Sequence, residues 1–393
     1  MRFWLESSPK LHQSSQSESK NELFQRLLKR ATGDGGKTIL HLAAEHQSEN
    51  SLGLIRELTG KELSPNDVDI SGWTPLFVAV QNSTEWTRAI VQLLLDRGAD
   101  VRLKDKLGRT PLHFAVQNHQ NPDFDIIKSL VEKGSDSNVR DHSGMTPLHI
   151  AVRNPTERAL AMVQLILKGQ VDVQLKDNFG KTALHFAAEN HSRFAYDIID
   201  SLIKKGFDPN EGNRINMTPL HYAVRNSSES AVAIVALLYL RGADVQIKSE
   251  DGRSVLHRAA MNHSKYGLDI IKSLMEKGSI PYERDIHGRT PLMYAVVSPT
   301  EWSRAIVQHL YDSGTDVKLK DKDGRTALHY AAMRHSDFAV DVVRSLLEKG
   351  ADPDEKDNFK RTPLDSGWMR RLLDEKNEQL LTSAALKKEN DSE

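Results

Sequence analysis

The sequence predicts an all-α solenoid, in which short helix-turn-helix units stack one on the next. A threonine or serine recurs in a single frame ten times along 393 residues, and a leucine follows two positions later in every copy. From the first copy to the last the distance is 362 − 38 = 324 residues, or nine intervals of 36. A fixed period of this length indicates a repeat array, in which each unit buries its apolar surface only against its neighbours. The ten positions are Thr38, Thr74, Thr110, Thr146, Thr182, Thr218, Ser254, Thr290, Thr326 and Thr362.

Each copy is typical of a turn that leads into a helix. Asp105 and Gly108 form an Asp-x-x-Gly pattern, which favours a type I turn closed by the carboxylate. Thr110 then stands where a helix N-cap is expected, and Pro111 suits the first helical position because it lacks an N–H group. His113 can reach back to the cap, as Glu does in a capping box. We therefore expect the first helix of every repeat to begin at this threonine or serine.

The residues from Thr110 to Ala115 read Thr-Pro-Leu-His-Phe-Ala, and close copies stand at 146–151 and 218–223. This motif resembles the T-P-L-H-x-A signature of ankyrin repeats, and the resemblance covers about residues 33–376. It implies an ankyrin-type helix-turn-helix solenoid, stacked into a curved superhelix with β-turn or hairpin fingers. It also implies that the finger tips and the inner face of the first helices bind partner proteins.

The repeat departs from the family pattern in its length, which is 36 residues rather than 33. The surplus lies between the two helices. In alternate repeats this segment carries an Asn or Ser followed three residues later by Glu, as in Asn82–Glu85 and Asn154–Glu157, which resembles a capping box. We therefore expect a second helix lengthened by one turn at its N-terminus. The intervening repeats read differently, so the array has a 72-residue double period. Duplication of repeat pairs explains it most simply, and a structural demand for alternation remains open.

The array divides the chain into four parts. Residues 1–18 are polar and are expected to be disordered. Residues 19–32 include an amphipathic segment that is expected to form an N-terminal capping helix, since the end of a solenoid needs a cover. The ten repeats occupy 33–376, and 377–393 form a polar C-terminal tail.

Composition excludes several classes of function. Lys and Arg number 53 against 54 Asp and Glu, so the net charge of −1 gives no overall attraction for nucleic acid. Cysteine is absent, which excludes disulfides and thiolate metal sites. No apolar run approaches the roughly 20 residues that span a bilayer, and the N-terminus lacks the apolar core of a secretory signal. We expect a monomer that is cytoplasmic, with the nucleus as the alternative location, and that needs no cofactor and has no small-molecule substrate.

The sixteen histidines do not predict a metal or catalytic site. Seven of them are the cap-binding residues of the repeat. Four others, His119, His191, His263 and His335, recur every second repeat. Successive members should then lie on the order of 20 Å apart, too far to share a zinc ion. Because every candidate nucleophile, acid or base belongs to a repeated structural position, we expect no enzymatic activity.

Partner-binding residues are expected where the repeats differ, at the turn tips and at the position before the motif threonine or serine. Trp73, Phe179 and Phe359 should be exposed anchors, and the arginines from Arg253 to Arg361 should favour an acidic segment. In an equally weighted alternative, these arginines pair with Asp251, Asp285 or Asp323 of their own chain. The full expected set is Trp73, Lys106, Arg109, Met145, Phe179, Lys181, Met217, Arg253, Arg289, Arg325, Phe359 and Arg361.

The leading functional hypothesis is a non-catalytic scaffold or adaptor that binds proteins through its concave face and turn tips. An alternative is an effector delivered by an intracellular microbe or virus, which would use the same surface to seize host proteins. Binding of nucleic acid through the C-terminal arginines is a weaker alternative, because the net charge is close to zero.

Overall fold

The computed structural model describes residues 19–31, 35–59, 63–117, 123–297, 299–333 and 336–365. Within these residues the chain is helical, without strands, and forms nine helix pairs between an N-terminal helix and a short 3-10 helix. The helix bounds are α1 Lys20–Ala31, α2 Ile39–His46, α3 Glu49–Leu58, α4 Pro75–Gln81, α5 Thr87–Asp96, α6 Pro111–Gln117, α7 Phe124–Glu132, α8 Pro147–Ala151, α9 Ala159–Leu167, α10 Ala183–Glu189, α11 Ala195–Lys205, α12 Pro219–Ala223, α13 Ala231–Leu240, α14 Val255–Ala259, α15 Gly267–Glu276, α16 Pro291–Ala295, α17 Ser303–Asp312, α18 Ala327–Ala332, α19 Asp337–Glu348 and η1 Pro363–Asp365.

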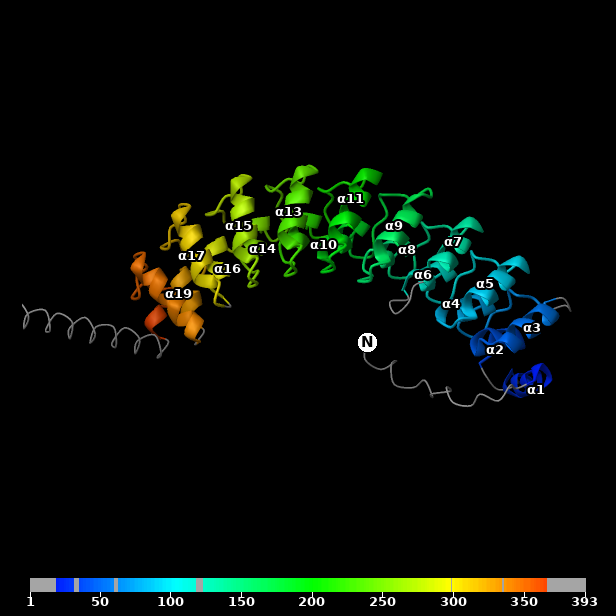
Figure 1. The fold of residues 1–393 in the computed structure, drawn as a ribbon. Helices are drawn as coiled ribbons and strands as arrows, with labels where there is room; N and C mark the ends of the chain where they lie inside the picture. The colour runs from blue at the N-terminus through cyan, green and yellow to red at the C-terminus, as the bar shows by residue number, and fades with distance from the viewer. Residues whose placement is uncertain are drawn as a thin grey trace, which may run out of the picture. The chain divides into compact units, whose positions relative to one another are not determined.

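The helices fall into two compact units, residues 1–142 and 143–393. Inside each unit the first helices of successive repeats pack on one another, and so do the second helices (Figure 1). The core lies between the two rows and consists of the motif leucine and alanine with the apolar residues of the second helix, such as Leu220, Ala223 and Ile234 in one repeat. The side formed by the first helices and the turn tips is called the inner face below.

The first helix, α1, covers the start of the array. It packs on α2 and α3 and buries Leu23 and Leu27 completely. The two leucines are one helical turn apart and so share a face. The expected disordered segment (1–18), the tail (377–393) and the second helix of the tenth repeat all lie outside the described residues.

The turn before each first helix is closed by its aspartate. The carboxylate of Asp177 accepts from the backbone N–H groups of Phe179 and Lys181, and the Asp177 N–H donates to the Lys181 carbonyl at 2.9 Å. A single backbone hydrogen bond then ties each tip to the preceding one, as from the Arg214 N–H to the Phe179 carbonyl at 3.0 Å. These tips are fixed turns without strand pairing in the described residues.

The second helix is not lengthened as expected. The helices of the four alternate repeats begin at Thr87, Ala159, Ala231 and Ser303. The three surplus residues form a separate tight turn instead, closed in one repeat by the Ala231 N–H donating to the Ser228 carbonyl at 3.1 Å. The prediction failed because the asparagine caps no helix.

In three successive repeats of the second unit the asparagine at this position, Asn190, Asn226 or Asn262, instead joins neighbouring repeats. The side-chain carbonyl of Asn226 accepts from the Ser228 N–H at 2.8 Å, while its Nδ2 donates to the Asn190 carbonyl at 2.9 Å. Asn262 repeats the arrangement, and its Nδ2 donates to the Val224 and Asn226 carbonyls. Asn226 and Asn262 are buried. Each therefore satisfies backbone groups that would otherwise be left without partners inside the stack.

Candidate functional site

The motif histidines have a structural role. In each of the seven, Nδ1 accepts from the backbone N–H of the cap residue. Nε2 of His185 donates to the Met217 carbonyl of the next repeat at 2.9 Å. Burial lowers the pKa of His185 and of His221 to about 4, so both are neutral at physiological pH. Among the described residues, no three His, Asp or Glu side chains come together as a metal site.

The turn tips of the second unit carry exposed apolar side chains. Phe179 is 70% exposed and Phe359 is 62% exposed, as expected for anchors, and Ile215 and Ile286 lie exposed on tips between them. We call these four residues the tip row. Ile70 and Leu107 occupy similar tips in the first unit, beside the exposed Lys106. Exposed apolar groups on turns tied down by backbone bonds form a preorganised contact surface.

Three of the expected partner-binding residues are not available on the surface as supposed. Met145 and Met217 are buried, and we leave them out of the proposed surface. Trp73 is half-buried rather than exposed. Its ring lies edge-on to Phe114, with centroids 5.1 Å apart, and stacks near Phe77. The aromatic residues of its own and the next repeat therefore cover the predicted anchor.

The two basic residues in the middle of the array, Arg109 and Lys181, are held by their own chain. Arg109 pairs with Asp105 at 2.7 Å, and its guanidinium lies 4.3 Å from the centre of the Phe114 ring. Lys181 pairs with Glu189 at 3.1 Å and lies over an aromatic ring of each of two repeats. Their charges are thus largely compensated before any partner arrives.

The C-terminal arginines follow the alternative that their own carboxylates hold them. Arg253 pairs with Asp251 and Asp285, and Arg325 pairs with Asp323 and Asp357. The remaining pairs are Arg289 with Asp321 at 3.7 Å and Arg361 with Asp357 at 2.8 Å. The first three arginines are half-buried, whereas Arg361 is exposed. This pairing weakens the hypothesis that the row attracts nucleic acid or an acidic segment along its whole length.

Tyrosines complete this row as a structural network. The Tyr330 hydroxyl donates to Asp321 at 2.5 Å, and burial together with this bond raises the pKa of Tyr330 to about 12. Tyr294 donates to Asp285 at 2.6 Å and accepts from Nε of Arg253 at 2.8 Å. The network therefore ties each turn to the first helix that follows it.

We expect Tyr330→Phe to lower the free energy of unfolding by about 2 kcal/mol, because it removes a buried hydrogen bond to a charged acceptor. Tyr222→Phe is the matched control, since the Tyr222 hydroxyl accepts from the neutral amide of Asn213, and should cost about 1 kcal/mol. Urea unfolding followed by circular dichroism measures both. Equal costs would show that the carboxylate contact adds nothing.

A second surface feature follows the first-helix ends of repeats six to nine. Arg225, Met261, Val297 and Met333 stand at the same position of successive repeats, on first helices that pack side by side. Met333 is 57% exposed, Met261 is also exposed and Val297 is half-buried. We call Met261, Val297 and Met333 the inner rail. It changes the inner face from charged to apolar along the second unit.

One residue of this face was missed by the sequence analysis. Arg258 occupies the variable position of the motif, where the flanking repeats carry Tyr222 and Tyr294. It is buried, and it donates to Asp251 at 3.0 Å. The signal was present in the sequence as the one charged residue at a position that is otherwise apolar or aromatic in the full repeats.

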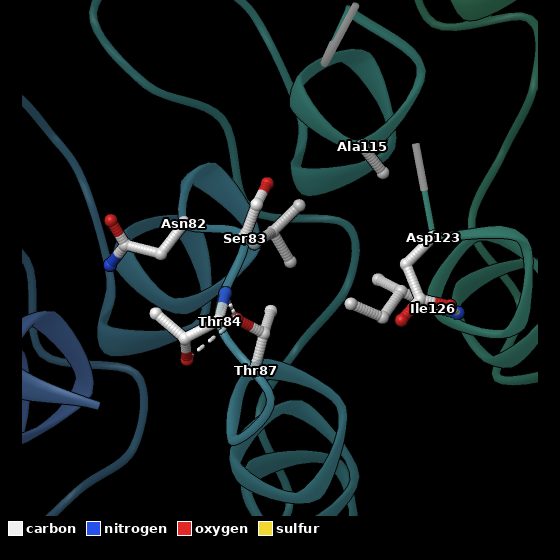
Figure 2. Close-up of a pocket in the computed structure, with 8 residues that line it drawn as sticks. Asn82, Ser83, Thr84, Thr87, Ala115, Asp123 and Ile126 are labelled. Atoms are coloured by element: carbon white, nitrogen blue, oxygen red, sulfur yellow. Dashed lines mark hydrogen bonds between the residues drawn. The ribbon is translucent and has the colours of Figure 1, made fainter. Parts of the chain in front are cut away.

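A small cavity lies in the first unit where the surplus residues pass between repeats (Figure 2). Its volume of about 30 Å³ suits a single water molecule. Figure 2 shows Asp123 and Ile126 facing Ser83, Thr84 and Thr87 across it. The cavity is too small to hold a cofactor. None of the described helices is long and apolar enough to cross a membrane.

These features define a helical repeat protein whose turn tips and first-helix ends carry exposed apolar side chains. The family model for ankyrin repeats, which spans three copies, matches residues 11–105, 84–177, 156–249, 227–321 and 301–374. The chain therefore belongs to the ankyrin-repeat family, whose members generally serve as protein-protein interaction modules. No curated protein sequence matches the chain.

Proposed function

We propose that this chain is a non-catalytic scaffold that binds partner proteins through the inner face of its repeats. The observation that carries the proposal is the tip row, in which Phe179, Ile215, Ile286 and Phe359 are exposed on turns fixed by backbone bonds. Apolar side chains on turns whose backbone is fixed before binding require little ordering of the chain on association, which is typical of interface anchors.

The polar groups of the repeats support a binding role over a catalytic one. The motif histidines are buried in caps, and the aspartates close turns. The arginines that would attract nucleic acid are paired with carboxylates of the same chain. Side chains with such fixed partners stabilise the repeats, and the apolar tips remain for recognition.

The test is affinity purification of the tagged chain with quantitative mass spectrometry. A variant with Phe179→Ser, Ile215→Ser, Ile286→Ser and Phe359→Ser should lose its specific partners by tenfold or more, because removing an interface anchor costs more than roughly 1.4 kcal/mol. The control replaces exposed apolar residues on the second-helix side, by Tyr196→Ser and Leu240→Ser, and should keep the partners. Circular dichroism confirms that both variants fold.

The opposite result would assign partner binding to a different surface. If the tip-row variant keeps every partner and the control variant loses them, the second helices bind and the inner face does not. If both variants keep every partner, the partners bind neither surface and the proposal is wrong.

A further inference from the structure

The seventh repeat departs from the others at two positions, Ser249 in its turn and Arg258 in its first helix, and it shares a turn aspartate at position 251 only with the ninth repeat. Ser249 stands where seven repeats have aspartate, and the carboxylate appears two residues later as Asp251. Arg258 replaces the aromatic residue of the neighbouring repeats. Asp251 accepts from Ser249 Oγ at 2.5 Å and pairs with both Arg253 and Arg258. The displaced carboxylate therefore compensates part of a local cluster of arginines.

The arginine cluster consists of Arg225, Arg253 and Arg258, and neighbouring carboxylates neutralise its positive charge only in part. Among the described residues, nothing donates to or accepts from the exposed Arg225 side chain, and Nε of the buried Arg258 also lacks a hydrogen-bond partner. Burial lowers the pKa of Arg258; the charge of Asp251 opposes this shift, whereas the charges of Arg253 and Arg225 add to it. The cluster thus has unused donors and a positive field, which favour an added carboxylate.

The inner rail begins at the same place. Arg258 lies in α14, and Met261 stands in the turn just past the end of that helix. The Met261 N–H donates to the Arg258 carbonyl at 3.2 Å, so the two residues are neighbours on this turn. Val297 and Met333 continue the rail at the next two repeats. Packed helices are roughly 10 Å apart, and an extended chain advances about 3.3 Å per residue. A strand of polypeptide lying along the rail would therefore meet one apolar position about every third residue.

We propose that this part of the inner face binds an extended segment of a partner protein that carries one Asp or Glu side chain followed by apolar residues at three-residue intervals. The carboxylate contacts the arginine cluster, and the apolar residues contact Met261, Val297 and Met333. The inference rests on the proposed function, and it specifies which chemistry the scaffold selects.

Nucleic acid fits this surface less well. A phosphate backbone needs a series of unpaired cations, because each neutralised phosphate adds to affinity. Beyond Arg253, the arginines of the following repeats already pair with Asp321 and Asp357. The exposed rail residues Met261 and Met333 are apolar. One anionic group followed by apolar contacts is a pattern that polypeptides provide.

The experiment is selection of phage-displayed random peptides of about 12 residues on the full-length chain, since this length spans roughly four repeats. Enriched sequences should share a carboxylate and apolar residues three positions apart. The strongest peptide, synthesised with a fluorophore, is then titrated against the chain by fluorescence polarisation. Arg225→Gln should weaken its binding by roughly 10- to 100-fold, as for loss of a charged hydrogen bond.

Replacing the peptide carboxylate by its amide should cause a similar loss, and the two changes together should cost little more than either alone. Arg258→Tyr, which restores the residue type of the neighbouring repeats, should also weaken binding. Arg304→Gln is the matched control, because Arg304 is an exposed arginine on α17 away from the rail, and should leave affinity unchanged.

Enriched peptides without a carboxylate, or with affinity unchanged by Arg225→Gln, would overturn the inference. If those peptides still lose binding when Phe179 and Ile215 become serine, the proposed function stands and only the assigned chemistry fails. If inner-face substitutions affect none of them, both proposals fail. The inference would also be overturned if a labelled single-stranded oligonucleotide bound more tightly than the selected peptide and Arg225→Gln abolished that binding.

Discussion

Acidification from neutral pH to about pH 4 should lower the free energy of unfolding of the second unit by roughly 6 kcal/mol through two histidines alone. The pKa of His185 and of His221 is lowered from 6.5 to about 4, mainly by burial, a difference of 2.5 pH units for each. One unit corresponds to about 1.4 kcal/mol, so each histidine contributes roughly 3 kcal/mol. That loss is comparable to the total stability of many domains.

The sign follows from the state in which each proton binds. The unfolded histidine takes up a proton near pH 6.5, whereas the folded one resists until about pH 4. The stabilisation is therefore complete above pH 6.5 and is lost as the pH falls toward 4. Asp251 and Asp285 also have lowered pKa values, but their contribution is lost only as the pH falls through 3.8 and below. The loss of stability between pH 6.5 and 4 can therefore be attributed to the histidines and not to these aspartates.

Urea unfolding at a series of pH values across this window measures the effect. His185→Gln provides the control, because glutamine can occupy a capping box but cannot take up a proton. It should be less stable at neutral pH, and its loss of stability on acidification should be smaller than that of the wild type by roughly 3 kcal/mol. The remaining dependence comes from His221 and from His257, His263 and His329, whose pKa values burial also lowers. A wild-type chain whose stability stays constant between pH 6.5 and 4, or a variant with the full dependence, would contradict the assignment.

The helical repeat could be predicted because its bonds are local in sequence. The cap threonine and its histidine are three residues apart, and the turn aspartate closes a loop of five residues, as in Thr182–His185 and Asp177–Lys181. A period of 36 residues then places identical units in contact. These short-range pairs recur often enough to be recognised without knowing how the repeats pack.

The exposure of individual site residues could not be predicted in the same way. Met217 and Arg253 occupy the same position of neighbouring repeats, yet the methionine is buried and the arginine is half-buried. A long basic side chain can cover apolar surface with its stem and still place its charge at the edge. Periodicity identifies the position, but the depth of each side chain depends on residues 36 positions away.

The double period has a partial structural counterpart. Lys176, Lys248 and Lys320 are spaced by 72 residues, and each pairs with a glutamate of the next repeat. The partners are Glu211, Glu283 and Glu355. Alternating repeats are therefore complementary at this contact. These pairs lie partly exposed at the surface, and surface pairs typically contribute no more than about 1 kcal/mol, so they accompany the alternation without requiring it.

Asn226→Ala should lower the free energy of unfolding by about 2 to 4 kcal/mol, the second large effect expected. Asn226 is 1% exposed and bonds both to Ser228 and to the Asn190 carbonyl of the preceding repeat. Its loss leaves a half-buried donor and a half-buried acceptor, the Ser228 N–H and the Asn190 carbonyl, without their partner, each costing roughly 1 to 2 kcal/mol. The same contact holds adjacent first helices in register. Loosening it should also weaken partner binding, because the inner face would no longer be preorganised.

Two further variants separate burial from bond count. Asn358→Ala removes a bond of the same kind, from Nδ2 to the Lys322 carbonyl, but at an exposed position where water can replace it. It should cost less than about 1 kcal/mol. Asn226→Asp keeps an acceptor for Ser228 and sets a carboxylate against the Asn190 carbonyl, so it should be at least as destabilising as alanine. Equal urea midpoints for Asn226→Ala and Asn358→Ala would mean that the buried asparagine stabilises the fold no more than an exposed one. The register of the inner face would then depend on apolar packing alone.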